Sequence, residues 1–302
     1  MEVVSLFSGC GGTDLGFMKA GHDIVLSNDI DKWACSSYES NLGVHPVIGD
    51  VSKIVKFPRT DILVGCYPCQ GFSIYGTRRK DDPRNSLYLQ FIRVLRQSKP
   101  KFFLTENVKG LLFGYGKVIL QDMLQKFRDS NYELYWKLIN AKDYGIPQDR
   151  ERVIIVGKRK DLLKSYEFPE ATHGDYLKPY VTLRDTIGDL NKPKEGEVFE
   201  GTFSSHYMSR NRKREWDQVS FTIQASGRHA PLHPSGKPME YVKQNVFKFV
   251  KGPNRRLSYK ECAAIQSFPK NWDFDGPLDK KYRQVGNAVP PLLARVFAEH
   301  FY

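Results

Sequence analysis

The chain has 302 residues, of which 40% are hydrophobic, so it can bury a substantial core and is not expected to be disordered. This length fits one large α/β domain, or one domain with a smaller lobe. No apolar stretch approaches the roughly 18 residues of a membrane span, and the first residues lack a basic stretch ahead of an apolar one. We therefore expect no membrane association and a cytoplasmic location.

The chain is strongly basic. It carries 46 lysines and arginines against 34 acidic residues, which gives a formal net charge of +12. This charge suits a polyanionic partner that is bound through phosphate contacts and counterion release. Many basic proteins only carry a solvated basic surface, so charge alone does not identify the partner.

The first half of the chain alternates short apolar runs with amphipathic stretches. Helical periodicity is present at residues 31–38, 86–96 and 118–128. Between these stretches we expect buried strands at residues 3–7, 24–27, 61–64, 102–105 and 153–156. Short connections and crossovers then favour an α/β fold with a doubly wound, mostly parallel sheet, which occupies a first domain over residues 1–168.

The composition changes after this domain. Residues 169–254 contain scattered proline, glycine, serine and arginine among short strand-like pieces, which predicts a smaller, irregular, strand-rich domain. Residues 255–302 regain helix signals, because Ser258 and Glu261 have capping-box spacing and a further helix is expected after Pro290 and Pro291. We expect this last segment to return to the first domain and complete it.

A glycine cluster, FSGCGG at residues 7–12, follows the first expected strand. Glycines at a strand-to-helix turn let the backbone approach a ligand, and the next helix offers unpaired N–H groups. Asp29 ends the second strand, where it would reach a ribose, and Asp50 ends a third apolar piece, where it would reach an adenine amino group. A plain tight turn and helix-capping aspartates are the alternatives.

Cys69 lies in the segment GCYPCQGFS, directly after the strand expected at residues 61–64. Open α/β sheets place their chemistry at the carboxyl ends of parallel strands, which makes Cys69 a candidate nucleophile. Cys66 and Cys69 also form a C-x-x-C pair, typical of redox motifs and zinc sites. Redox motifs usually open a helix, however, and no second pair has ligand spacing, so we expect no metal. The other cysteines, at positions 10, 35 and 262, are expected to be inert buried thiols.

Three further polar segments follow expected strands or turns. Glu106, in TENV, ends the strand at residues 102–105 and would hydrogen-bond a heterocycle near the same edge of the sheet, or simply cap a helix. Arg150 and Arg152, in QDRER, share one side of an extended segment and would converge on a carbonyl or phosphate, or form surface ion pairs. The segment QVGNAVPP at residues 284–291 indicates only a polar turn that starts the final helix.

Together and in this order, these segments resemble the cytosine-5 DNA methyltransferase family. The matching blocks are FSGCGG, PCQ followed by GFS, ENV, QDRER, RLSYKECAAIQSFP and GNAVPP. The resemblance spans residues 3 to about 300, and the succession of PCQ, ENV and QxRxR is highly specific. It implies a Rossmann-like fold of the S-adenosylmethionine-dependent methyltransferases, with S-adenosylmethionine as cofactor, no metal, and a bacterial restriction-modification setting.

The resemblance also implies roles for individual residues. Cys69 would be the nucleophile, Glu106 would bond the N3 and amino groups of a flipped-out cytosine, and Arg152, helped by Arg150, would lie near its O2. Asp29 stands where the family usually has Glu, so its reach to the ribose is shorter. The residues implied for the cofactor pocket are Phe7, Gly9, Gly11, Gly12, Asp29, Ile30, Asp50, Val51, Pro68, Leu87, Asn287 and Ala288.

The implied partner is double-stranded DNA, which the smaller domain would recognise. The pieces MSRNR and FTIQASGRHAPLHP resemble those of bacterial methyltransferases specific for GGCC. A single recognition domain suggests a monomer, and a cognate restriction endonuclease would act separately. The residues expected to contact DNA are Gln70, Ser73, Arg78 and Arg79 in the loop after Cys69, and Arg210, Arg212 and Arg228 in the smaller domain.

Three other functions have to be weighed. A tRNA-modifying branch of the family keeps PCQ and ENV, but its Cys-Phe-Thr tripeptide is missing here. A non-catalytic DNA-binding protein would not need Cys69, Glu106 and Arg152 together. A thioredoxin-like oxidoreductase would depend on Cys66, whereas a methyltransferase would not.

Overall fold

The computed structural model describes residues 1–68 and 86–302. Contacts divide the chain into two compact units. Unit 1 contains Met1–Asn140, Glu151–Glu170 and Leu293–Tyr302, and unit 2 contains Ala141–Arg150 and Ala171–Leu292. The first domain expected from the sequence, residues 1–168, thus provides most of unit 1, while the QDR segment groups with the recognition region.

The C-terminal return is shorter than the expected 255–302. Residues up to Leu292 pack within unit 2, where α6 (Tyr259–Ile265) lies against α7 (Leu278–Asn287). The Tyr282 hydroxyl of α7 donates to the Leu257 carbonyl over 2.7 Å, which ties α7 to the residues before α6. The assignment of separate functions to residues 1–168, 169–254 and 255–302 remains a prediction.

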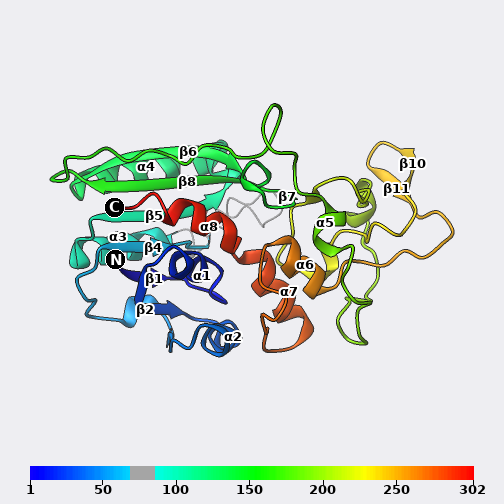
Figure 1. Ribbon diagram of the computed structural model, residues 1–302, viewed down its shortest axis with the longest axis horizontal. Coiled ribbons are helices and arrows are strands. Elements are labelled where there is room, and N and C mark those ends of the chain that lie inside the picture. Colours follow the sequence, from blue (N-terminus) through cyan, green and yellow to red (C-terminus); the bar gives the residue numbers. More distant parts are fainter. Residues whose placement is uncertain (69–85) are drawn as a thin grey trace. The chain divides into compact units, whose positions relative to one another are not determined.

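A seven-stranded sheet forms the centre of unit 1, in the order β3-β2-β1-β4-β5-β8-β6 (Figure 1). Strands β1 to β5 are parallel, and β8 is antiparallel to both of its neighbours. The bounds are β1 Glu2–Leu6, β2 Asp23–Asp29, β3 Val47–Ile48, β4 Ile62–Gly65, β5 Phe102–Val108, β6 Tyr132–Asn140 and β8 Glu151–Arg159. All five predicted strands are present, and the predicted mostly parallel α/β fold is confirmed.

Aromatic side chains pack on both faces of this sheet, because successive residues of a strand point to opposite faces. On one face, Phe103 packs against Phe91 and Phe127, at ring centroid distances of 5.7 and 4.6 Å. On the other face, Phe102 lies 5.2 Å from Phe301, which also stacks on Phe17. The helices that supply or flank these contacts are α1 Gly12–Lys19, α2 Lys32–Leu42, α3 Leu87–Ser98, α4 Gly114–Asp129 and α8 Pro291–Ala298.

Strand β6 was not expected from the sequence. Its segment, YELYWKLIN, mixes charged and aromatic residues and contains no continuous apolar run. It lies at the edge of the sheet, and Trp136 in its middle is 44% exposed. An edge strand needs only a partly apolar face, so its sequence lacks the long apolar run that is typical of a buried strand.

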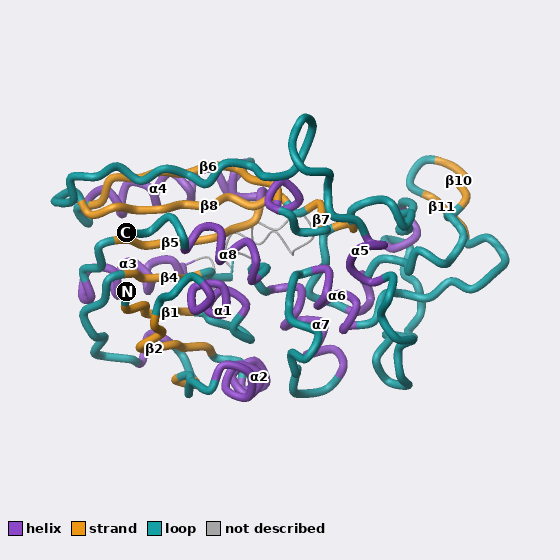
Figure 2. Tube along the Cα trace, in the orientation of Figure 1, coloured by secondary structure: helices purple, strands orange, loops and turns teal. Residues whose placement is uncertain are grey.

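Unit 2 consists mainly of loops with short elements, as Figure 2 shows. The strands β7 and β9 pair in parallel, and β10 and β11 form an antiparallel hairpin. Their bounds are β7 Gln148–Asp149, β9 Ser220–Phe221, β10 Glu240–Lys243 and β11 Val246–Lys248, with one further helix, α5 Leu183–Ile187. Within the described residues, 3-10 turns lie at Val51–Lys53, Lys109–Leu112, Ala141–Tyr144, Tyr207–Ser209 and Gly227–His229.

The helix ends of the C-terminal segment follow from local chemistry. The capping box predicted for α6 is present, since Ser258 and Glu261 cap each other's backbone N–H groups. The polar turn at residues 284–291 leads into the final helix, as expected, since α8 starts at Pro291, but it also contains the end of a preceding helix, α7, at Asn287. Proline is tolerated at the first position of a helix but not in its interior, so the two helices are separate.

Within the described residues, no helix combines the length and apolar character that crossing a membrane requires.

Candidate active site and cofactor loop

The glycine cluster forms the loop between β1 and α1, and Asp29 holds it. The Gly9 N–H donates to Asp29 Oδ2 and the Asp31 N–H donates to Asp29 Oδ1, each over 2.8 Å. Burial raises the pKa of Asp29, and these backbone hydrogen bonds oppose that rise. The carboxylate predicted to meet a ribose therefore also organises the loop that precedes α1.

The other predicted cofactor residues of unit 1 follow the carboxyl ends of neighbouring parallel strands. Ile30 follows β2 and is 71% exposed, whereas Val51 is buried. Asp50 accepts a hydrogen bond from the Ser52 N–H over 2.9 Å and so caps the 3-10 turn after β3. This is the capping role that the sequence offered as the alternative to cofactor binding. Phe7 follows β1, Pro68 follows β4, and Leu87 is the first residue of α3. Asn287 and Ala288 belong to unit 2.

Cys66 lies just past the end of β4, beside the ENV segment. It receives a hydrogen bond from the Glu106 backbone and interacts with the Thr13 side chain. Burial, and then the Glu106 carboxyl, raise the pKa of the Cys66 thiol far above neutrality. A thiol held protonated does not suit a redox pair, so the oxidoreductase interpretation loses support.

Glu106 and Arg152 form a nearly buried ion pair. Arg152 Nε lies 2.8 Å from Glu106 Oε1, and their side chains are 11% and 9% exposed. The antiparallel pairing of β5 with β8 places Arg152 opposite Val108, two residues beyond Glu106, so both side chains reach the same face. Burial lowers the pKa of Arg152, and the Glu106 carboxyl opposes this. Two of the predicted catalytic residues therefore meet at the carboxyl end of β5.

Arg150 does not join this pair. Its side chain is fully buried in unit 2, where the guanidinium donates to the carbonyls of Gly286 and Ala288 over 3.2 and 3.0 Å, and to that of Ile223 over 3.5 Å. The alternation of side chains along an extended segment predicts that Arg150 and Arg152 converge on one ligand. In the structure, the Arg150 guanidinium instead donates to these carbonyls. Its predicted catalytic role is therefore replaced by a structural one, which holds the GNA turn.

We expect Arg150→Met to destabilise the protein by about 3–5 kcal/mol, because it leaves buried carbonyls without their donor. Thermal unfolding followed by circular dichroism would measure this loss. Arg228→Ala provides the control, since Arg228 is exposed and should change stability by no more than about 0.5 kcal/mol. Equal melting temperatures for Arg150→Met and the parent protein would refute the structural role.

The arginines of the recognition region divide into buried and accessible ones. Arg212 is 3% exposed and donates to the carbonyls of Tyr207 and His206 over 2.8 and 2.6 Å. This placement corrects the expectation that Arg212 contacts DNA. Arg210 and Arg214 instead lie over the Phe221 ring, at 5.8 and 4.0 Å from its centroid, in an arrangement that the sequence did not reveal.

The segment around Phe221 lies against the QDR segment within unit 2. The Ile223 N–H donates to Gln148 Oε1 over 2.8 Å, and Gln148 Nε2 donates to Gln266 Oε1 over 2.6 Å. Gln266 in turn donates to the Val285 carbonyl over 2.6 Å. These buried amides join the QDRER and RLSYKECAAIQSFP blocks to the FTIQASGRHAPLHP piece and to Val285, directly before GNAVPP. Five predicted site residues, Cys69, Gln70, Ser73, Arg78 and Arg79, lie outside the described residues.

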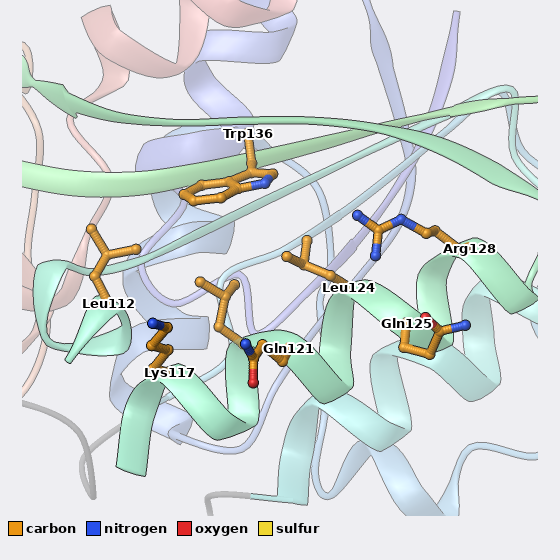
Figure 3. Close-up of a pocket in the computed structure, with 8 residues that line it drawn as sticks. Leu112, Lys117, Gln121, Leu124, Gln125, Arg128 and Trp136 are labelled. Carbon is orange, nitrogen blue, oxygen red and sulfur yellow. The ribbon is translucent and has the colours of Figure 1, made fainter. Parts of the chain in front are cut away.

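A groove of about 490 Å³ lies between α4 and β6 (Figure 3). Leu112, Leu120 and Leu124 form its apolar lining, and Trp136 lies across from α4. Among the described residues, none that is predicted to serve catalysis or cofactor binding lines this groove.

The chain matches known proteins over its whole length. The family model described as C-5 cytosine-specific DNA methylase matches residues 1–302. The Type II methyltransferase M.BsuRI of Bacillus subtilis is 44% identical over 343 residues, covering 99% of this chain and 78% of the relative. M.BspRI of Lysinibacillus sphaericus is 45% identical over 342 residues, covering 99% and 80%.

One solved structure shows the same fold. It is a prophage-encoded protein of E. coli described as a DNA modification methyltransferase, which superimposes with a TM-score of 0.76 at 22% identity. The match covers 100% of this chain and 98% of that one. At this identity, the likeness concerns the fold alone.

Proposed function

From the premise that this chain belongs to the C-5 cytosine-specific DNA methylase family, we propose that it methylates a flipped-out cytosine through a covalent bond to Cys69. The family and its Type II relatives support the coarser statement directly: the chain is a DNA cytosine-5 methyltransferase that depends on S-adenosylmethionine. The attacking residue, the residues around the base and the target sequence are the parts that we propose.

The chemistry of the cytosine ring explains why a cysteine is needed. C5 is a poor nucleophile until another group adds at C6, and Cys69 as a thiolate would form that C6–S bond. The electron pair then at C5 takes the methyl group, which S-adenosylmethionine supplies from its sulfonium. Loss of the C5 proton and expulsion of the thiolate restore the ring and the enzyme. A base inside the duplex cannot be reached, so it must be flipped out at a cost of a few kcal/mol.

The observation that carries this proposal is the meeting of Cys66, Glu106 and Arg152 at the carboxyl ends of β4 and β5. In the proposed complex, the Glu106 carboxyl would stabilise the protonated N3 while the cysteine adds at C6. The Arg152 guanidinium would hold this carboxyl in place and lie near O2. Electrostatic support of this kind is strongest in a site that is largely shielded from water, as this pair is.

We further propose that the target is GGCC and that residues 169–254, nearly all of which belong to unit 2, recognise it. Support comes from the pieces MSRNR and FTIQASGRHAPLHP, and from the cations held over Phe221. Arg228 in the same segment is exposed and therefore accessible to a guanine edge. Arg212, being buried, would support this region rather than contact DNA. We also propose that the enzyme acts as a monomer, separately from any restriction endonuclease.

Methyl transfer to unmethylated genomic DNA, followed by bisulfite sequencing, tests the activity and the target. We expect 5-methylcytosine within GGCC and at no other motif. Methylation at a different motif would refute the proposed target but not the enzyme. Transfer to tRNA in place of DNA would contradict the DNA substrate.

Arg228→Ala tests the recognition residue. We expect it to lower kcat/KM on a GGCC duplex by about 10- to 100-fold, the effect of losing one good base contact, while its thermal stability stays unchanged. Lys243→Ala, in the exposed β10–β11 hairpin, is the control for loss of one positive charge. A loss of the same size in both variants would mean that Arg228 contributes only charge.

A further inference from the structure

A buried carboxyl lies directly behind the glycine loop. Asp14 is the third residue of α1, and its side chain is completely inaccessible to solvent. The Ser5 hydroxyl donates to Asp14 Oδ1 and the Tyr38 hydroxyl donates to Asp14 Oδ2, each over 2.6 Å. Asp14 thus connects three elements that are labelled in Figure 1, β1, α1 and α2.

The Tyr38 ring supports the loop backbone at Gly11. Gly11 has a φ of +90°, and a Cβ placed there would lie 3.0 Å from the Tyr38 ring and 2.8 Å from Leu42 Cδ1. The ring therefore packs against the backbone at the point where the loop becomes α1. Tyr38 is itself fully buried, so its hydroxyl needs an acceptor, and Asp14 provides it, while the Ser27 side chain interacts with the same hydroxyl.

We propose that Asp14 is a positioning residue for cofactor binding: through its hydrogen bond to Tyr38, it fixes the ring that sets the shape of the glycine loop at Gly11. This inference rests on the proposed assignment of residues 7–12 to S-adenosylmethionine. Asp14 is not among the residues expected to touch the cofactor. It acts on cofactor affinity through Tyr38.

The ionisation of Asp14 makes this role measurable. Burial raises the pKa of Asp14 to about 6, although the hydrogen bonds from Ser5 and Tyr38 oppose the rise. The titratable groups that face it, Tyr38 and Cys66, have pKa values raised far above neutrality by burial, and burial raises the pKa of Cys35, behind Tyr38, to about 12. These three groups stay neutral as Asp14 titrates.

Protonation of Asp14 changes which hydrogen bonds its carboxyl group can accept. As a carboxylate it accepts from both hydroxyls, as the structure shows, whereas the acid has one oxygen that donates. One of the two hydroxyls must then reorient. Cofactor affinity should accordingly fall as the pH drops through about 6, and Asp14→Asn should lack this inflection. Asp29, whose pKa is also raised by burial, is present in both proteins, so any inflection that it causes would remain in the variant.

The test measures the affinity for S-adenosylhomocysteine by isothermal titration calorimetry near pH 8 and near pH 5.5. We expect Tyr38→Phe to weaken binding about tenfold near pH 8, because the ring beside Gly11 loses the hydrogen bond that fixes it. Its kcat at saturating S-adenosylmethionine should stay within about twofold of the parent value, since the catalytic residues are untouched. Ser5→Ala is the matched control: it removes the other hydrogen bond to Asp14 but leaves Tyr38 in place, and should weaken binding less than threefold.

Three outcomes separate the possibilities. Normal affinity in Tyr38→Phe, or an unchanged pH inflection in Asp14→Asn, would overturn the inference. So would a loss of affinity in Ser5→Ala equal to that in Tyr38→Phe, because it would indicate general loosening of the fold. Gly11→Ala tests the underlying assignment: if it binds S-adenosylhomocysteine normally, residues 7–12 are not the cofactor loop. If Gly11→Ala loses binding while Tyr38→Phe and Asp14→Asn bind normally, the cofactor assignment survives and only the role of Asp14 fails.

Discussion

Replacing Cys69 by alanine is expected to reduce methyl transfer to DNA by on the order of 10⁴-fold or more, the scale seen when an enzyme loses its nucleophile. Without addition at C6, the C5 position cannot accept the methyl group at a useful rate. Transfer of labelled methyl from S-adenosylmethionine to a GGCC duplex measures the loss. The Cys69→Ala variant should still bind the same duplex, as measured by fluorescence anisotropy.

Cys66→Ser is the matched control, because it changes the other cysteine of the C-x-x-C pair. The Cys66 thiol is kept protonated by burial, and a serine hydroxyl can replace it between Thr13 and the Glu106 backbone. We therefore expect this variant to keep transferring methyl groups. Loss of activity in Cys66→Ser together with activity in Cys69→Ala would reverse the assignment of the nucleophile.

Glu106→Gln is the second substitution with a large expected effect. Glutamine keeps the size of the side chain but cannot stabilise a protonated N3 as a carboxylate does, so kcat should fall by about 10²- to 10⁴-fold. The affinity for S-adenosylhomocysteine should not change, since Glu106 is not part of the proposed cofactor pocket. Single-turnover kinetics would separate the rate of methyl transfer from effects on binding. An unchanged kcat would exclude Glu106 from the chemistry.

The same ion pair also predicts an effect on stability. Glu106→Ala leaves the nearly buried Arg152 without its counter-charge, which should cost about 3–5 kcal/mol. Glu299→Gln is the comparison, because Arg295 and Glu299 form an ion pair of similar length, 2.7 Å, at about half exposure. Screening by water limits the effect there to roughly 0.5 kcal/mol. Equal losses in both variants would show that the Glu106–Arg152 pair is not shielded as described.

The strands that could be predicted from the sequence are those with continuous apolar runs. β4 and β5 are buried along almost their whole length, and their apolar residues are visible without a structure. β6 lies at the edge of the sheet, and charged residues interrupt its apolar ones. Its sequence therefore resembles that of a surface segment. The helix expected after Pro290 and Pro291 is present as α8, whereas the polar turn before it gives no sign that another helix, α7, ends within it.

The candidate site could be predicted where residue type alone carries the chemistry. Glu106 and Arg152 were each predicted from their own sequence block through the family resemblance, and the structure brings them together. Arg150 and Arg212 were misjudged because a sequence shows a positive charge but not the carbonyl oxygens around it. Asp14 gave no signal, since its importance depends on Tyr38, which lies on a different helix.

The most direct test of the central claim is covalent trapping of the enzyme on a GGCC duplex that carries 5-fluorocytosine at the target position. Fluorine at C5 cannot leave as a proton does, so the enzyme that has added to C6 and transferred the methyl group stays bound. With S-adenosylmethionine present, we expect a denaturation-resistant complex whose peptide map places the DNA on Cys69. Absence of the complex, or an adduct on another residue, in a protein that methylates ordinary duplex DNA would contradict the proposed mechanism.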